Sequence, residues 1–104
     1  MPADDLNFQN YSTVQNNAQP APATIASAAT VAPTGFLSFI SGTTAIASVT
    51  PPVSGAHMLT FVFTTTTPVA FTTTGGNIKA VATPTQNVPM LLIYNPLEAK
   101  YYLK

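Results

Sequence analysis

His57 is the only histidine of the chain, and histidine is the side-chain type whose ordinary pKa lies nearest to neutral pH. A catalytic histidine needs a carboxylate that orients it and a nucleophile or substrate beside it. The side-chain carboxylates are Asp4 and Asp5 near one end of the sequence and Glu98 near the other. These acids have no catalytic spacing relative to His57, so the pattern favours a structural histidine at the start of a strand.

The sequence also lacks the groups needed to bind a metal ion or a phosphate. One histidine and three scattered acids form no ligand cluster, and the absence of cysteine removes thiolate ligands and nucleophiles. The glycine pair in the segment 73–77 lacks the Lys-Ser/Thr ending of a phosphate-binding loop, and no helical pattern follows it. We therefore expect a non-enzymatic protein that holds no metal and no cofactor.

Charge is scarce in this chain and sits mostly at its two ends. Charged residues make up 6% of the 104 residues, against roughly a quarter in an ordinary soluble domain. A near-neutral surface promotes association, so we expect other protein to cover much of it. The charged residues are Asp4, Asp5, Lys79, Glu98, Lys100 and Lys104.

The same composition excludes two other classes of partner. The formal net charge is zero, which removes the phosphate attraction that drives nucleic-acid binding. No apolar run approaches the ~20 residues of a membrane-spanning helix. We expect neither nucleic acid nor a membrane as the partner.

Residues 1–22 have the composition of an arm. The segment is rich in asparagine and glutamine, and Pro20 and Pro22 close it. A floppy terminus, one short turn of helix and an arm docked on a neighbouring subunit all remain open, and we favour docking. Fully extended, this segment spans ~70 Å. Its few apolar residues are Leu6, Phe8, Tyr11 and Val14.

Residues 23–104 have the pattern of a β domain. Short apolar and threonine-rich runs recur at the spacing of strands, with Gly, Pro and Asn turns between them. This pattern predicts an all-β fold, a small antiparallel sandwich or barrel of about seven short strands. The expected strands are 24–31, 35–40, 43–50, 57–63, 68–72, 78–83, 88–94 and 99–104.

The segment 57–63 predicts a strand that is covered on both sides. Leu59, Phe61 and Phe63 alternate with Met58 and Val62, so both faces of the strand are largely apolar.

The aromatic residues divide into two groups. The tyrosines of the last hairpin, Tyr94, Tyr101 and Tyr102, are expected to pack across the strands, although a tyrosine cluster also suits stacking on a sugar. The phenylalanines are expected in the core or at a subunit interface, and they include Phe36, Phe39, Phe61 and Phe63.

Three pieces of sequence follow one another in a characteristic order. They are ISGTTAIASVTPP at 40–52, FTTTGGNI at 71–78, and LIYN at 92–95 with the Tyr101-Tyr102 pair. Together they resemble a module of tailed-bacteriophage structural proteins, with the motifs G-T-T-A-I-A-x-[IV]-T-P-P, F-T-T-x-G-N-I and L-x-Y-[DN]-x-x-x-x-[WY]-Y. The chain departs from the module by an extra glycine at 75–76, by Pro96 in the last turn, and by tyrosine where tryptophan is common.

The resemblance implies a β-structured virion component that is often trimeric. Such modules occur in head decoration (cement) proteins and at the ends of fibre proteins. A fibre needs a shaft, and a chain of 104 residues without a repeat leaves no room for one. The hypothesis is therefore a capsid decoration protein, made in the host cytoplasm and bound to the capsid exterior.

In this hypothesis the partner is the major capsid (coat) protein. The contacts would come from Phe8, Tyr11 and Val14 of the arm, and binding only to assembled coat would stabilise the shell by mass action. The alternative is a receptor- or glycan-binding tip of a phage tail fibre that uses Tyr94, Tyr101 and Tyr102.

Overall fold

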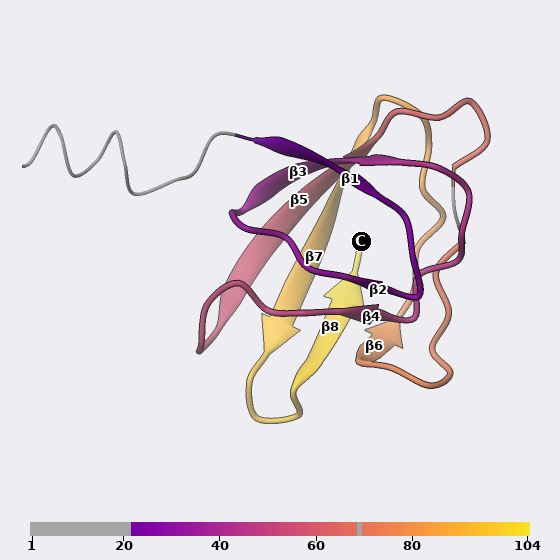
Figure 1. Ribbon diagram of the computed structural model, residues 1–104. Coiled ribbons are helices and arrows are strands. Elements are labelled where there is room, and N and C mark those ends of the chain that lie inside the picture. Colours follow the sequence, from indigo (N-terminus) through magenta and orange to yellow (C-terminus); the bar gives the residue numbers. More distant parts are fainter. Residues whose placement is uncertain (1–21, 69) are drawn as a thin grey trace, which may run out of the picture.

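The computed structural model describes residues 22–68 and 70–104. These residues form strands and no helix, which confirms the all-β class (Figure 1). None of them belongs to a helix long and apolar enough to cross a membrane. The strands are β1 (Ala23–Ala26), β2 (Thr30–Val31), β3 (Leu37–Ser41), β4 (Ser48–Val49), β5 (His57–Phe63), β6 (Ile78–Ala80), β7 (Pro89–Asn95) and β8 (Lys100–Leu103).

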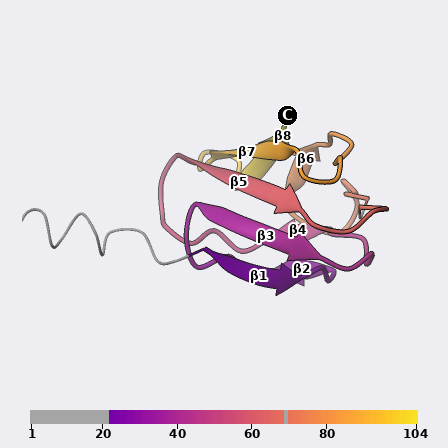
Figure 2. The same ribbon diagram turned by 90° about the horizontal axis from the view of Figure 1, so that it is seen from above.

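The chain winds between two sheets before it closes with a hairpin. The larger sheet has six strands in the order β1-β3-β5-β7-β8-β6, and β2 pairs with β4 in a separate two-stranded sheet (Figure 1). The chain leaves the larger sheet after β1 and again after β3, passes through β2 or β4, and returns beside the strand it left. Seen from above, β1, β3, β5 and β7 follow one another across the larger sheet (Figure 2).

Both sheets contain parallel neighbours, so the expected antiparallel arrangement is wrong. Four strand pairings are parallel, and only β5 with β7 and β7 with β8 are antiparallel. Parallel neighbours need a long crossover, and the two-stranded sheet lies within the first two crossovers. The Ser41-Gly42 pair, a turn signal in the sequence, starts the second crossover, with a φ of 86° at Gly42.

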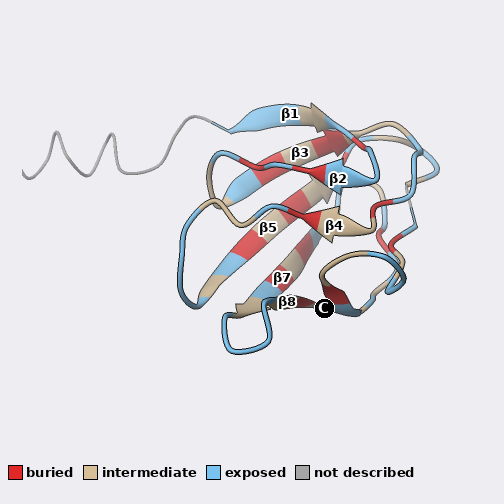
Figure 3. Cartoon of the chain, turned by 60° about the horizontal axis from the view of Figure 1, so that its bottom comes forward, coloured by how far each residue is buried: buried red, intermediate tan, exposed pale blue. Residues whose placement is uncertain are grey.

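One face of the six-stranded sheet packs against β2, β4 and the neighbouring loops. Along β5, Leu59, Phe61 and Phe63 are fully buried, and buried residues alternate with more exposed ones (Figure 3). The core cluster also contains Val31 from β2 and Val49 from β4. Burial of each such side chain contributes about 1.5–3 kcal/mol, so this single interior accounts for the hydrophobic stabilisation of the described domain.

Only one face of β5 is covered by the described residues. Met58 is 51% exposed, and Thr60 and Val62 are half-buried. Covering of the second face, which the sequence predicts, would have to come from outside the described residues and stays a prediction.

Three expected strands are broken, shortened or absent. The segment 24–31 is interrupted after Ala26 and forms β1 and β2. The segment 43–50 keeps only β4 and a bridge from Ile46 to Phe71, and this bridge is the only strand-like pairing in the described part of 68–72. The other five expected strands are found within three residues of their predicted ends. The apolar residues of these segments led to predicted strands that are too long, because the segments have no long pairing partners in the fold.

A short polar junction ties the two sheets together beside β6. The Asn77 side chain accepts a hydrogen bond from the Val49 amide at 2.8 Å and donates one to the Val49 carbonyl at 2.7 Å. Next to it, Gly76 lies so close to Ala47 that a Cβ would stand 1.8 Å from the Ala47 carbonyl oxygen. The second glycine of the Gly75-Gly76 pair is thus required by a close backbone approach.

Replacing Gly76 by alanine should lower the free energy of unfolding by ~3 kcal/mol, because the clashing neighbour is backbone and cannot rotate away. Gly75→Ala is the matched control, since its φ is +83° but nothing lies within 4 Å of the added Cβ. The control should cost only ~1–2 kcal/mol, the strain of a left-handed alanine. Chemical denaturation of both variants measures the difference, and equal losses would contradict the close approach.

Candidate interaction surface

The outer face is the side of the six-stranded sheet turned away from β2 and β4. The described elements that pack on the sheet, β2 and β4, lie on its opposite side (Figure 3). Buried and more exposed residues alternate along the strands, and this alternation shows which side chains belong to the outer face. No side chain at the centre of the outer face is charged. The centre consists of Leu37, Phe39, Met58, Thr60, Val62, Leu91, Ile93 and Tyr102.

The strand register arranges these side chains in rows across the sheet. In the central row Leu37 pairs with Thr60, and Thr60 pairs with Leu91. The Leu91 backbone exchanges two hydrogen bonds with Lys104, at 2.9 and 3.1 Å, so the row ends at a lysine. The outer face is therefore a continuous surface over β3, β5, β7 and β8.

Large apolar side chains of the outer face remain open to solvent. Met58 is 51% exposed, Ile93 is 42% exposed and Leu37 is 38% exposed. Four strands spaced ~4.8 Å apart and about six residues long give a flat area of ~400 Å². An uncharged apolar patch of this size on one chain is typical of an interaction site.

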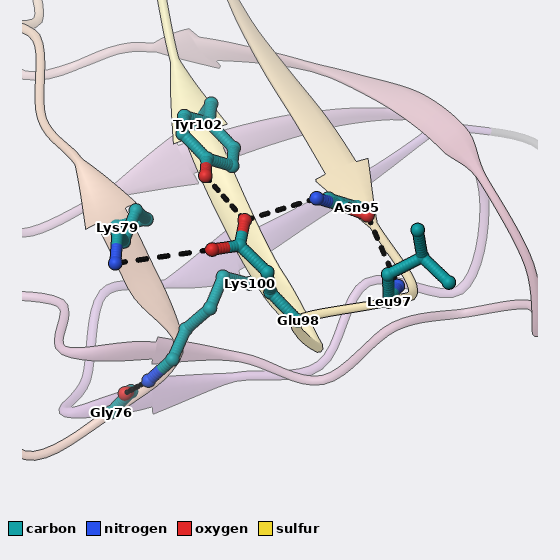
Figure 4. A network of polar contacts seen from close by, with 7 residues as sticks. All are labelled: Gly76, Lys79, Asn95, Leu97, Glu98, Lys100 and Tyr102. Carbon is teal, nitrogen blue, oxygen red and sulfur yellow. Dashed lines mark hydrogen bonds and ion pairs between the residues drawn. The ribbon is translucent and has the colours of Figure 1, made fainter.

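Charged residues border the outer face on one side. Lys79 on β6, Lys100 on β8 and Lys104 just beyond β8 form what we call the lysine rim. The Lys79 Nζ lies 3.9 Å from a Glu98 carboxylate oxygen, and the Lys100 Nζ donates to the Gly76 carbonyl at 3.0 Å (Figure 4). Three lysines and one glutamate leave this side of the described chain with a formal charge of +2.

The turn between β7 and β8 is braced by polar contacts around Glu98 (Figure 4). The Glu98 carboxylate accepts hydrogen bonds from the Tyr102 hydroxyl and, at 3.0 Å, from the Asn95 side-chain amide. The Leu97 amide donates to the Asn95 side-chain oxygen at 3.0 Å. These contacts fix the turn while leaving the Leu97 side chain 95% exposed.

The hydrogen bond from Tyr102 holds the pKa of Glu98 below its ordinary value, and the same bond raises the pKa of Tyr102. The nearby lysines lower the pKa of Glu98 further. Because this pKa is lowered in the folded chain, the contact adds stability above the ordinary carboxyl range. That stability is lost as the pH falls through the lowered pKa.

His57 lies at the inner edge of the sheet and is occupied by structural contacts. Its Nδ1 lies 2.9 Å from the Gly55 carbonyl oxygen, which can only accept, so Nδ1 carries the proton. Its Nε2 lies 2.8 Å from the Tyr101 hydroxyl, within hydrogen-bond distance. The ring also stacks on Tyr94, with centroids 4.8 Å apart. Both ring nitrogens are engaged, which matches the structural histidine that the sequence favours.

The described residues contain no cluster of His, Cys, Asp or Glu that could hold a metal ion. A shallow hollow between the segments 68–71 and 81–84 is lined by proline, alanine, valine, threonine and phenylalanine, without a titratable group. Among the described features, the outer face is the strongest candidate site.

The structure separates the aromatic residues that the sequence grouped together. Phe61 and Phe63 are core residues, Phe36 packs against the core, and Phe39 lies half-buried on the outer face. The expected arm contacts at Phe8, Tyr11 and Val14 lie outside the described residues.

The three hairpin tyrosines do not form one surface. Tyr101 is fully buried, and burial raises its pKa. Tyr94 is on the same inner side, whereas Tyr102 faces outward and bonds to Glu98. The structure therefore offers no shared tyrosine platform for a sugar.

Sequence reasoning did not identify most of the outer face. Met58 and Val62 were recognised as one apolar side of a strand, but Leu37, Leu91 and Ile93 were not assigned to the same surface. The signal was present as period-two apolar residues on the second side of each strand. Only the strand order could show that these sides adjoin.

Tyr102→Phe should raise the pKa of Glu98 toward 4.5, its ordinary value, because the main hydrogen bond to the carboxylate is lost. Glu98 is the only glutamate of the chain, so a carbon-13 NMR titration of glutamate carboxyls reports it alone. Tyr94→Phe is the matched control, since Tyr94 stacks on His57 on the other side of the sheet. An unchanged midpoint in the Tyr102 variant would rule out this contact in solution.

No protein-family model, curated protein or solved structure matches this chain. Its function is therefore argued from the outer face, the lysine rim and the sequence.

Proposed function

We propose that this chain is a non-enzymatic capsid decoration protein of a bacteriophage, which binds assembled coat protein on the capsid exterior and stabilises the shell. The observation that carries the proposal is the outer face, an uncharged apolar surface on a chain that has very few charges. Such a surface favours a protein that acts by contact with other protein. The resemblance of residues 40–104 to phage structural modules supplies the kind of assembly.

Two surfaces contact the coat in this proposal. Phe8, Tyr11 and Val14 of the arm lie along the shell, and the outer face packs against it. The β body is of the small sandwich type, and three copies gather at one site of the lattice, as the resemblance implies. Neither nucleic acid nor a membrane is involved.

Stabilisation of the shell follows from selective binding. A ligand that binds the assembled state alone stabilises it by about 2.7 kcal/mol when its free concentration is a hundred times Kd. Because the effect is mass action, it requires no catalysis and no cofactor. Each occupied site adds its own contribution, so many copies per particle give a large total effect.

The glycan-binding alternative draws no support from the last hairpin. Tyr101 is fully buried and Tyr102 faces the opposite side of the sheet. A sugar could therefore not stack on these two tyrosines together.

Ile93→Asp should weaken binding to assembled shells about 30-fold, equivalent to ~2 kcal/mol, because it places a charge in the centre of the contact. Leu97→Asp is the matched control, since Leu97 is 95% exposed in the turn and lies off the outer face. Co-sedimentation with purified shells, and with unassembled coat protein, measures both variants.

The proposal requires that wild-type protein sediments with shells and not with unassembled coat. Equal weakening by Ile93→Asp and Leu97→Asp would show that the outer face is not the contact. An Ala triple variant at Phe8, Tyr11 and Val14 tests the arm separately, and full binding by that variant would remove the arm from the proposal.

A further inference from the structure

We propose that, in the unassembled protein, residues 1–21 of the same chain dock across the outer face. Their apolar side chains cover its centre, and Asp4 and Asp5 reach the lysine rim. The docking does not rest on the proposed role in a capsid, because it concerns the isolated chain alone. Three independent features of the chain lead to it.

The first feature is the point at which the segment joins the domain. Residues 1–21 lead through Pro22 into β1, an edge strand of the six-stranded sheet. Ala23 pairs with Ser38, so the start of β1 lies level with Leu37, the first residue of the central row. The segment therefore joins the domain at the end of the central row opposite Lys104.

The second feature is the length of the segment. Four strand spacings separate β1 from β8 in the sheet order, a distance of ~19 Å. From Ala23 back to Asp5 the chain spans ~60 Å when fully extended and ~27 Å when helical. Asp5 can therefore reach the lysine rim with either backbone geometry.

The third feature is the match of charge and apolarity. Asp4 and Asp5 give the segment a formal charge of −2, and the lysine rim with Glu98 carries +2, so the whole chain is neutral. Between the two acids and the domain lie Leu6, Phe8, Tyr11 and Val14, the apolar residues needed to cover an apolar centre. Opposite charges at the far end would fix the direction of docking, most strongly at low ionic strength.

The area of the outer face also favours a segment of chain over a second copy of the domain. A stable interface buries ~800 Å² on each partner, about twice the ~400 Å² of the flat outer face. A tethered segment needs less area, because its high effective concentration replaces part of the contact energy.

In the proposed function, the arm and the outer face both contact the coat. Docking within one chain would make these two surfaces cover each other. A partner that binds both surfaces would open the docked form more effectively than a partner that binds one, which would favour coat that presents both contacts. The apparent affinity for the shell would fall by the fraction of chains that are open. The arm and the outer face would then act as one switch.

Disulfide trapping tests the docking directly, because the chain has no cysteine of its own. Gln9→Cys is combined with Thr60→Cys in the central row, or with Thr30→Cys on the opposite sheet as control. Thr30 is exposed, and both pairs close through the same segment between Gln9 and Ala23, so the comparison does not depend on sequence separation. We expect the Gln9–Thr60 pair to form an intramolecular disulfide faster, and to form it more slowly once Asp4 and Asp5 are changed to asparagine.

The competing outcomes are distinguished on a non-reducing gel followed by peptide mapping. Faster trapping at Thr30, or equal rates, would mean that the segment does not dock on the outer face. Disulfide-linked dimers in place of the intramolecular product would mean that a second copy occupies it. Either result would overturn the proposal, while leaving shell binding by the outer face open to its own test.

Methionine methyl NMR of the full chain provides a second measurement without cysteine. Met58 lies on the outer face, and Met90 is 4% exposed in the core. Phe8→Ala with Tyr11→Ala should shift the Met58 methyl resonance, because two aromatic rings leave its surroundings, and should leave Met90 unchanged. An unmoved Met58 resonance, or equal shifts of both, would contradict docking.

Discussion

The structure depends on one constraint: the described chain supplies a covering layer for only one face of its six-stranded sheet. Along β5, Leu59, Phe61 and Phe63 turn toward β2 and β4 and are fully buried. Because side chains alternate along a strand, Met58, Thr60 and Val62 must turn the other way. Burial in the core does not account for the apolar character of Met58 and Val62. The same side of the sheet also carries few charged residues.

The fold class could be predicted from the sequence, but the path of the chain could not. Period-two apolar residues and frequent turns correctly indicated strands at β3, β5, β7 and β8, and the hairpin before β8 was correctly placed. Gly42 was read only as a turn signal. Whether a turn continues into a neighbouring strand or into a crossover depends on tertiary packing, here on the closeness of Gly76 to Ala47 and the contacts of Asn77 with Val49.

The candidate site could be predicted only in outline. His57 begins a strand, as the sequence predicts. The expectation from sparse charge, that other protein covers much of the surface, stays a prediction. The members of the outer face come from four strands, and their adjacency depends on a sheet order that local sequence does not encode. The expected packing across the strands holds for Tyr94 and Tyr101. Tyr102 is separated from them because neighbours along a strand lie on opposite faces.

Charge, apolarity and topology converge on the outer face, which we propose is covered by residues 1–21 in the free chain and by coat protein in the assembly. The most direct measurement is the rate at which hydrogen peroxide oxidises Met58 in the intact, unassembled protein, compared with a free methionine derivative. A covered outer face predicts that Met58 reacts much more slowly than the free derivative, although 51% of its surface is open in the described residues. Oxidation of Met58 at the rate of free methionine would contradict a covered outer face.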